Sequence, residues 1–172
     1  GEGQAIDMAL LDTQVAVLAN LGASYLVGGR YEGKVPGRMG IAHVNIVPYQ
    51  VFETAPKPNG ERDHMIVAVG NDGQFAKLCD IMGHPEWAAD PRFQKNPDRV
   101  RHRQVLVPLL SEVFLTRNKS DWLADFERQQ VPGAPINQLS EVFVDPQVQA
   151  RGMVETPALT VCETAAHILF LR

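Results

Sequence analysis

The chain has 172 residues, of which 45% are hydrophobic and 21% charged, with a formal net charge of -4. This composition is typical of a globular protein that can bury a core, and a negative charge with scattered basic residues disfavours nucleic-acid binding. No signal peptide and no apolar run of about 18 residues is present, so we expect no membrane association and a cytoplasmic location.

An alternating apolar pattern over residues 5–10 predicts a strand, with one face formed by Ile6, Met8 and Leu10. A helix from Leu11 to Tyr25 should follow, capped by Asp12 or Thr13 and ended by Gly28 and Gly29. Gly22 inside this helix indicates close packing of another element. Because the sequence starts directly before a core-like strand, we expect it to be part of a longer chain.

The segment from Gly28 to Asn45 has no sustained period and is rich in glycine, which predicts an irregular loop. A loop of more than about 12 residues is usually functional or disordered, although a plain connector is an alternative. Within it, Arg38, His43 and Asn45 can meet an anionic acyl or carboxylate group through charge-assisted hydrogen bonds. A surface histidine without function is the simpler interpretation of His43.

Two apolar runs, Ile46–Phe52 and Met65–Val69, flank a turn-forming stretch that contains Pro56, Pro58 and Gly60, which predicts a β-hairpin. A helix capped by Asp72 should begin near Gly73 and end at Gly83. Its apolar residues recur at helical spacing, so we expect them to share one face that covers the hairpin: Phe75, Leu78, Cys79 and Met82. Cys79 is then a small buried thiol.

The following residues predict mainly helices. Trp87 and Phe93 should anchor a proline-broken stretch, and a helix from Asn96 to about Arg117 should be kinked at Pro108. Further helices are expected after caps at Ser120 and Asp145, with a short one between them at residues 140–144. The whole has the composition of an α+β unit.

Motifs for several kinds of chemistry are missing. No His-x-x-x-His or Cys-x-x-Cys pair suggests a metal site, and neither a phosphate-binding loop nor a Gly-x-Ser-x-Gly elbow is present. Asp7, the one carboxylate within a predicted strand, is better explained by a fixed hydrogen bond than by catalysis.

Six blocks in order resemble the family III CoA-transferases, a group with carnitine-CoA transferases, formyl-CoA transferases and α-methylacyl-CoA racemases. The blocks are GEGQAIDMALLD (1–12), AHVNIVPYQVF (42–52), AVGNDGQFAKLC (68–79), DPRFQKNPDRV (90–100), VPGAPIN (131–137) and DPQVQARGMV (145–154). The second and third blocks are most similar to transferases that act on dicarboxylates.

The resemblance implies an α+β fold in which residues 1–29 are a fragment of a large Rossmann-like domain and residues 30–154 form the small domain. Residues 155–172 are an atypical tail. It also implies an interlocked homodimer, and a catalytic aspartate that lies upstream of Gly1 and forms an aspartyl-CoA thioester. No catalytic residue is therefore expected in this chain, which alone should be inactive.

By the same resemblance, a glycine-rich loop near Gly33–Gly40 covers the intermediate. The substrate-covering residues would be Gly37, Arg38, Gly40, His43 and Asn45, although the family's consecutive glycines are replaced here by Gly37-Arg38-Met39-Gly40. The substrates would be an acyl-CoA and a carboxylic acid, with coenzyme A thioester as substrate and no permanently bound cofactor. Two alternatives remain: an acyl-CoA racemase of the same family, or a non-catalytic structural or dimerisation module.

Overall fold

The computed structural model describes residues 3–29, 31–33 and 35–154. The chain forms two compact units, one that ends at Gly40 and one that starts at Ile41. The break lies later than the predicted domain boundary at residues 29 and 30. The predicted assignment of the first part to a Rossmann-like domain stays a prediction, and the predicted tail at 155–172 lies outside the described residues.

The first unit consists of short helices: α1 (Leu10–Val17), α2 (Ala19–Ser24) and the π-helical turn η1 (Tyr25–Gly29). The predicted strand at residues 5–10 is wrong, because residues 3–9 have no regular secondary structure. Alternation marks only one apolar face, and a strand also needs a hydrogen-bonded neighbour.

The start of α1 also differs from the prediction. Neither Asp12 nor Thr13 caps it; the residue before its first turn is Ala9, and the Thr13 hydroxyl donates to the Ala9 carbonyl at 3.0 Å. A Cβ on Gly22 would meet nothing within 4 Å, so the expected close packing is not seen among the described residues. No single helix among the described residues is long and apolar enough to cross a membrane; Leu10–Val17 and Ala19–Gly29, bent by 66°, reach that length and composition only when they are taken together.

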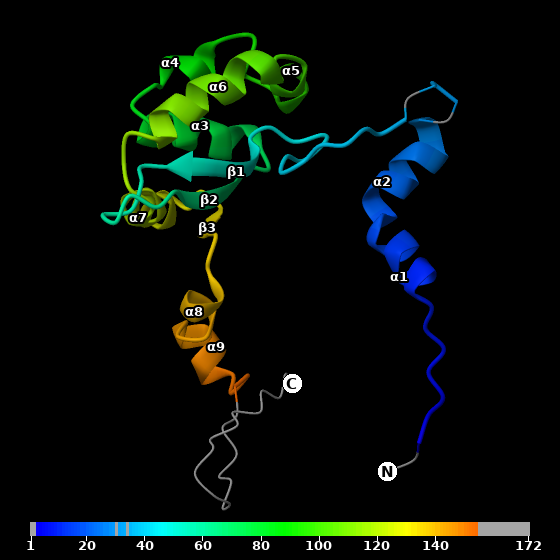
Figure 1. Ribbon diagram of the computed structural model, residues 1–172. Coiled ribbons are helices and arrows are strands. Elements are labelled where there is room, and N and C mark those ends of the chain that lie inside the picture. Colours follow the sequence, from blue (N-terminus) through cyan, green and yellow to red (C-terminus); the bar gives the residue numbers. More distant parts are fainter. Residues whose placement is uncertain (1–2, 30, 34, 155–172) are drawn as a thin grey trace, which may run out of the picture. The chain divides into compact units, whose positions relative to one another are not determined.

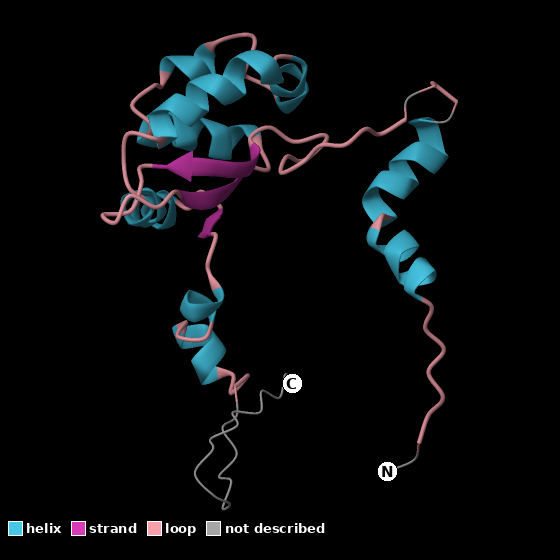
Figure 2. Cartoon of the chain, viewed as in Figure 1, coloured by secondary structure: helices cyan, strands magenta, loops and turns pink. Residues whose placement is uncertain are grey.

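The second unit is built on the predicted β-hairpin. Strands β1 (Tyr49–Thr54) and β2 (Asp63–Ala68) pair antiparallel, with Phe52 opposite Met65. A short third strand, β3 (Gly133–Pro135), pairs antiparallel with β2, which gives the order β1-β2-β3 (Figure 2). The hairpin is therefore confirmed, whereas β3 was not predicted.

Helix α3 (Asp72–Ile81) follows β2 and matches the predicted helix closely. Its predicted apolar face is buried, including Cys79, and Gly83 follows it with a φ of +75°. The predicted cap is wrong: the Asn71 side chain accepts from the Gln74 backbone N–H at 2.9 Å. Asp72 lies in the first turn and has other partners.

The remaining helices are α4 (Glu86–Ala89), α5 (Asn96–Arg101), α6 (Arg103–Phe114), α7 (Lys119–Gln129), α8 (Leu139–Val142) and α9 (Pro146–Ala150). The expected single helix from Asn96 is broken at His102, whose ψ of 21° is not helical, while Pro108 lies inside α6. Asn118, rather than Ser120, caps α7, and Asp145 caps α9 as predicted.

One hydrophobic core holds the second unit together. Helices α3, α5 and α6 lie on one side of β1, and α7 lies beside β2 and β3 (Figure 1). The largest apolar side chains of the core are less than 2% exposed: Phe75, Phe93, Phe114, Trp122, Phe126, Met65, Leu78, Leu106 and Leu110. Phe93 is thus an anchor as predicted, and Trp87 packs against the core from its rim. Helices packed on a small antiparallel sheet make this unit an α+β fold.

Candidate functional site

The predicted substrate-covering residues fall into both units. Gly37, Arg38 and Gly40 belong to the first, and His43 and Asn45 to the second. Gly40, at the boundary, has a φ of +60°, in the left-handed region that favours glycine. Of the five residues, the structure brings together His43 and Asn45.

The residues from Ile41 to Pro48 lead into β1, and we call them the entry segment (pink loop before β1 in Figure 2). Within it, the His43 ring stacks on Tyr49 with centroids 5.2 Å apart and planes 7° apart. The Asn45 backbone N–H donates to Nδ1 of His43 at 3.1 Å, so Nδ1 is an acceptor and the proton of the neutral imidazole belongs to Nε2. The His43 backbone N–H donates to the Tyr49 carbonyl at 2.8 Å. His43 is therefore fixed in position and tautomer.

Three side chains from α5 and α6 hold the backbone of the entry segment. Asn96 donates to the Asn45 carbonyl at 2.7 Å and accepts from the Val47 N–H at 3.1 Å. Arg103 donates from Nη2 to the carbonyls of His43 and Val44, at 2.7 and 2.9 Å. Arg99 donates from Nε to the Val47 carbonyl at 2.7 Å. These bonds satisfy backbone groups that have no strand partner.

Arg99 is the buried centre of this arrangement. Its guanidinium lies 4.4 Å from the ring centroid of Phe75, and Nη1 donates to the Phe93 carbonyl at 2.9 Å. Nη2 donates to Oδ1 of Asp72 at 3.0 Å. Burial lowers the pKa of Arg99, and Asp72 opposes that effect. Burial by itself raises the pKa of Asp72, but hydrogen bonds from Arg99 and Lys95 outweigh it and hold this pKa below its ordinary value of 3.8.

Sequence reasoning missed Asn96, Arg99 and Arg103 as anchors. A signal was available for the two arginines: residues 99, 103, 106 and 110 are spaced by four and three, and Leu106 and Leu110 are buried. Two arginines on the apolar face of a helical region are expected to donate hydrogen bonds to acceptors inside the protein, since charged side chains are rarely buried without partners.

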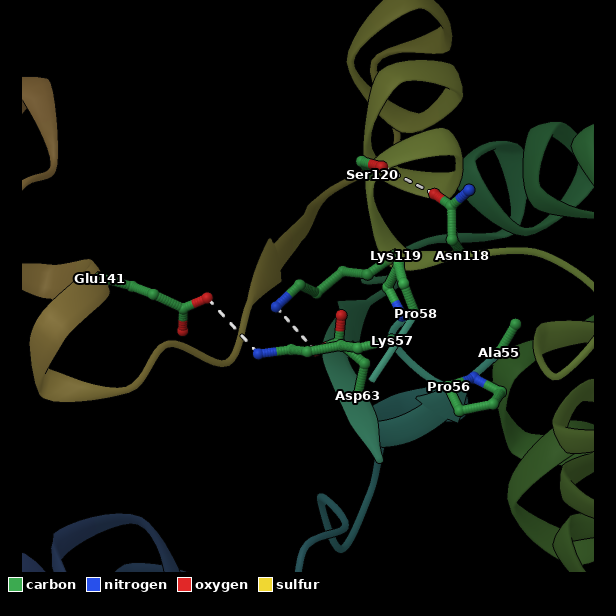
Figure 3. A pocket seen from close by; sticks show the side chains of 9 residues that line it. All are labelled: Ala55, Pro56, Lys57, Pro58, Asp63, Asn118, Lys119, Ser120 and Glu141. Atoms are coloured by element: carbon green, nitrogen blue, oxygen red, sulfur yellow. Dashed lines mark hydrogen bonds and ion pairs between the residues drawn. The ribbon is translucent and has the colours of Figure 1, made fainter. Parts of the chain in front are cut away.

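A second candidate is a cavity of about 340 Å³, lined by both charged and apolar residues, between the hairpin tip, the start of α7 and α8. Figure 3 shows two ion pairs there: Lys119 Nζ lies 2.8 Å from Asp63 Oδ1, and Lys57 Nζ lies 3.6 Å from Glu141 Oε1. Each lysine that lines the cavity therefore has a carboxylate partner. The pairs balance their charges, so the cavity is better suited to joining three elements than to capturing an anion.

The Lys119–Asp63 pair is the more protected of the two, with both side chains 13% exposed. Burial by itself raises the pKa of Asp63. Hydrogen bonds from Lys119 and from the His64 backbone N–H outweigh this effect and hold the pKa below its ordinary value of 3.8. Within the described ranges, no three His, Cys, Asp or Glu residues converge as metal ligands.

Comparison with known proteins adds independent information. The profile of CoA-transferase family III matches residues 1–168. The chain is 49% identical over 153 residues to a succinate–glutarate CoA-transferase from Agrobacterium fabrum, covering 89% of this chain and 36% of that protein. It is 41% identical over 154 residues to succinyl-CoA:glutarate CoA-transferase of Homo sapiens, covering 90% of this chain and 33% of that protein.

Among solved structures, a CAIB/BAIF family protein from Brucella suis is similar, with a TM-score of 0.71 and 41% identity. The match covers 99% of this chain and 44% of that one. The chain spans about a third of the length of the curated relatives it matches. With a profile match over nearly all its residues, the chain belongs to CoA-transferase family III.

Proposed function

We propose that this chain is the small, substrate-covering part of a longer enzyme that moves CoA between carboxylic acids. The main support is the family match over residues 1–168, together with relatives that are named as CoA-transferases. The nucleophile is an aspartate upstream of Gly1, and the chain alone is inactive. We further propose that the longer protein works as a homodimer.

In the proposed reaction, the aspartate carboxylate attacks the thioester carbonyl, the CoA thiolate leaves, and a mixed anhydride forms. The thiolate then attacks the aspartyl carbonyl, which gives an aspartyl-CoA thioester and releases the first carboxylic acid. The second carboxylic acid reverses these steps and leaves as the new acyl-CoA. Covalent catalysis of this kind divides one difficult transfer into easier ones.

Water is the competitor in such a reaction, because the anhydride and the thioester both hydrolyse. A covering element that excludes water therefore protects the transfer. The entry segment suits this role: it follows the glycine-rich stretch that ends at Gly40 and is fixed by Asn96, Arg99 and Arg103. A cover needs both a part that moves and a part that stays in place.

The proposed substrates are short dicarboxylic acids and their CoA thioesters. The support comes from two relatives: one that is 49% identical is named a succinate–glutarate CoA-transferase, and one that is 41% identical is named a succinyl-CoA:glutarate CoA-transferase. Other relatives, at 30–32% identity, are named for oxalate and mesaconate, which are also dicarboxylates.

The test uses the longer protein that contains this chain, incubated with succinyl-CoA and then with hydroxylamine. Hydroxylamine converts an aspartyl thioester into a hydroxamate, which mass spectrometry of the digested protein locates on one residue. We expect the adduct on an aspartate upstream of Gly1, and none in untreated protein. Absence of any adduct, with exchange of the substrate α-hydrogen in deuterated solvent, would instead favour the racemase. CoA exchange by the 172-residue chain alone would contradict its proposed inactivity.

A further inference from the structure

Two arginines reach the entry segment, and they are not equivalent. Arg99 is fully buried, lies over Phe75, and bonds to Phe93 and Asp72 as well as to Val47. It is therefore part of the core. Among the described residues, the side chain of Arg103 donates hydrogen bonds only to the entry segment, at the carbonyls of His43 and Val44.

The other terminal nitrogen of Arg103 points to a role beyond stability. Nη1 is shielded from solvent and has no hydrogen-bond partner among the described residues. A buried donor without an acceptor is unfavourable, so Arg103 is not optimised for the stability of the second unit alone. What distinguishes this residue is the pair of carbonyls that Nη2 holds.

The backbone carbonyl that Arg103 holds belongs to His43, whose imidazole is a candidate functional group. Arg103 holds this carbonyl, Tyr49 accepts from the N–H of His43 and stacks on its ring, and Asn45 donates to Nδ1. The imidazole consequently has one orientation and one tautomer, with its proton on Nε2. Loss of the Arg103 contact would release the His43–Val44 backbone next to Gly40, where the two compact units meet in sequence.

We propose that Arg103 is a positioning residue for the transfer reaction: it fixes the base from which the covering loop closes and thereby keeps water from the aspartyl intermediates. The inference rests on the proposed function and adds to it a residue that does not touch the substrate. Arg103 acts through the backbone at His43 and Val44.

The experiment compares Arg103→Ala and Arg103→Lys with Arg101→Ala in the longer protein. Arg101 is the matched control, because it is exposed and its ion pair in the described part of the chain is with Asp98 on its own helix. The readout is the ratio of acyl-CoA hydrolysis to CoA transfer. Since misplacement of a covering element by about 1 Å can change a rate up to about a hundredfold, we expect Arg103→Ala to raise this ratio at least about tenfold. Arg103→Lys, which keeps a donor, should give an intermediate value.

A purely structural role gives a different result, because loss of folded protein lowers hydrolysis and transfer together. An unchanged ratio in Arg103→Ala therefore overturns the proposal. If that variant does not fold, Arg103→Lys takes its place, and an unchanged ratio there has the same meaning.

A second measurement separates this inference from the proposed function. Hydrogen exchange followed by mass spectrometry reports on peptides that cover residues 41–48, and it needs no substrate. We expect faster exchange there in the Arg103 variants than in Arg101→Ala. Equal exchange in the Arg103 and Arg101 variants overturns the proposal. If the Arg103 variants exchange faster but the unmodified protein shows no CoA transfer, the proposed function alone is contradicted.

Discussion

Arg99 donates from Nη2 to Oδ1 of Asp72 at 3.0 Å, which joins α5 to the first turn of α3 across 27 positions in the sequence. Removal of the Arg99 side chain would leave the carbonyls of Val47 and Phe93 without their donors inside the core. We expect Arg99→Ala to lower the free energy of unfolding by about 2–5 kcal/mol, because each of the two buried carbonyls that loses its donor costs about 1–3 kcal/mol.

Urea unfolding of the 172-residue chain, followed by circular dichroism, measures this effect. Arg92→Ala is the control, because Arg92 is 54% exposed and pairs with Asp90 at the surface. That substitution should cost less than about 1 kcal/mol. Equal losses in the two variants would contradict the structural role of Arg99.

The ion pair between Lys119 and Asp63 predicts an acid-sensitive contribution to stability. The pKa of Asp63 is lower in the folded chain than its ordinary value of 3.8, so the folded state binds fewer protons at acidic pH. The stabilisation is complete above about pH 5 and is lost as the pH falls through the folded pKa. Asp63→Asn should thus destabilise the chain near neutral pH and approach the unmodified chain near pH 2. A constant difference in unfolding free energy across this range would contradict the prediction.

Gly133 in β3 has no room for a side chain. A Cβ there would lie 2.7 Å from Cδ2 of Phe126 and 3.1 Å from the Ile66 carbonyl oxygen. We expect Gly133→Ala to destabilise the chain by about 1–3 kcal/mol, because overpacking forces β3 or Phe126 to move. Gly22→Ala, which meets nothing within 4 Å, is the control and should not destabilise. Thermal unfolding of both variants tests this, and an unaffected Gly133→Ala would be the contrary result.

Cys79 should be unreactive in the folded chain. Burial raises the pKa of its thiol to about 12, so little thiolate exists at pH 8. Brief treatment with iodoacetamide, followed by peptide mapping, should show Cys79 unmodified in native protein and fully modified in urea. Rapid labelling of Cys79 under native conditions would show that α3 does not pack as described.

The first unit exposes many large apolar side chains, and we expect the chain to self-associate through them. Leu11 and Leu18 are 72% and 53% exposed. Sedimentation velocity should show concentration-dependent association that the double substitution of these leucines by lysine reduces. The same change at Leu115 and Leu139, which are exposed in the second unit, serves as the control. A clean monomer of the unmodified chain would exclude this behaviour.

Local pattern was sufficient to predict the hairpin and α3. The apolar spacing from Phe75 to Met82 is a property of one helix, and Gly83 ends it by local geometry alone. Local pattern was not sufficient to choose between two neighbouring caps. Asn71 and Asp72 are both good caps, and the choice of Asn71 goes together with the recruitment of Asp72 by Arg99, a residue 27 positions away.

The missed strand β3, the wrong strand at residues 5–10 and the missed anchors have the same origin: each depends on a partner that is distant in the sequence. Residues 133–135 lack the alternation of a strand, and β3 exists because β2 offers an open edge to pair with. Residues 5–10 have the alternation but no such partner in the described ranges. The anchors of the candidate site, Asn96 and Arg103, depend on contacts 51 to 60 positions apart, which no local pattern contains.

The hydrogen bonds from the side chains of α5 and α6 to the entry segment end on main-chain atoms: the carbonyls of residues 43, 44, 45 and 47 and the N–H of Val47. Anchoring is consequently indifferent to which side chains are carried at Val44 and Asn45. These two side chains can therefore be exchanged without loosening the attachment of the entry segment to α5 and α6, so its surface can change while its backbone stays in place.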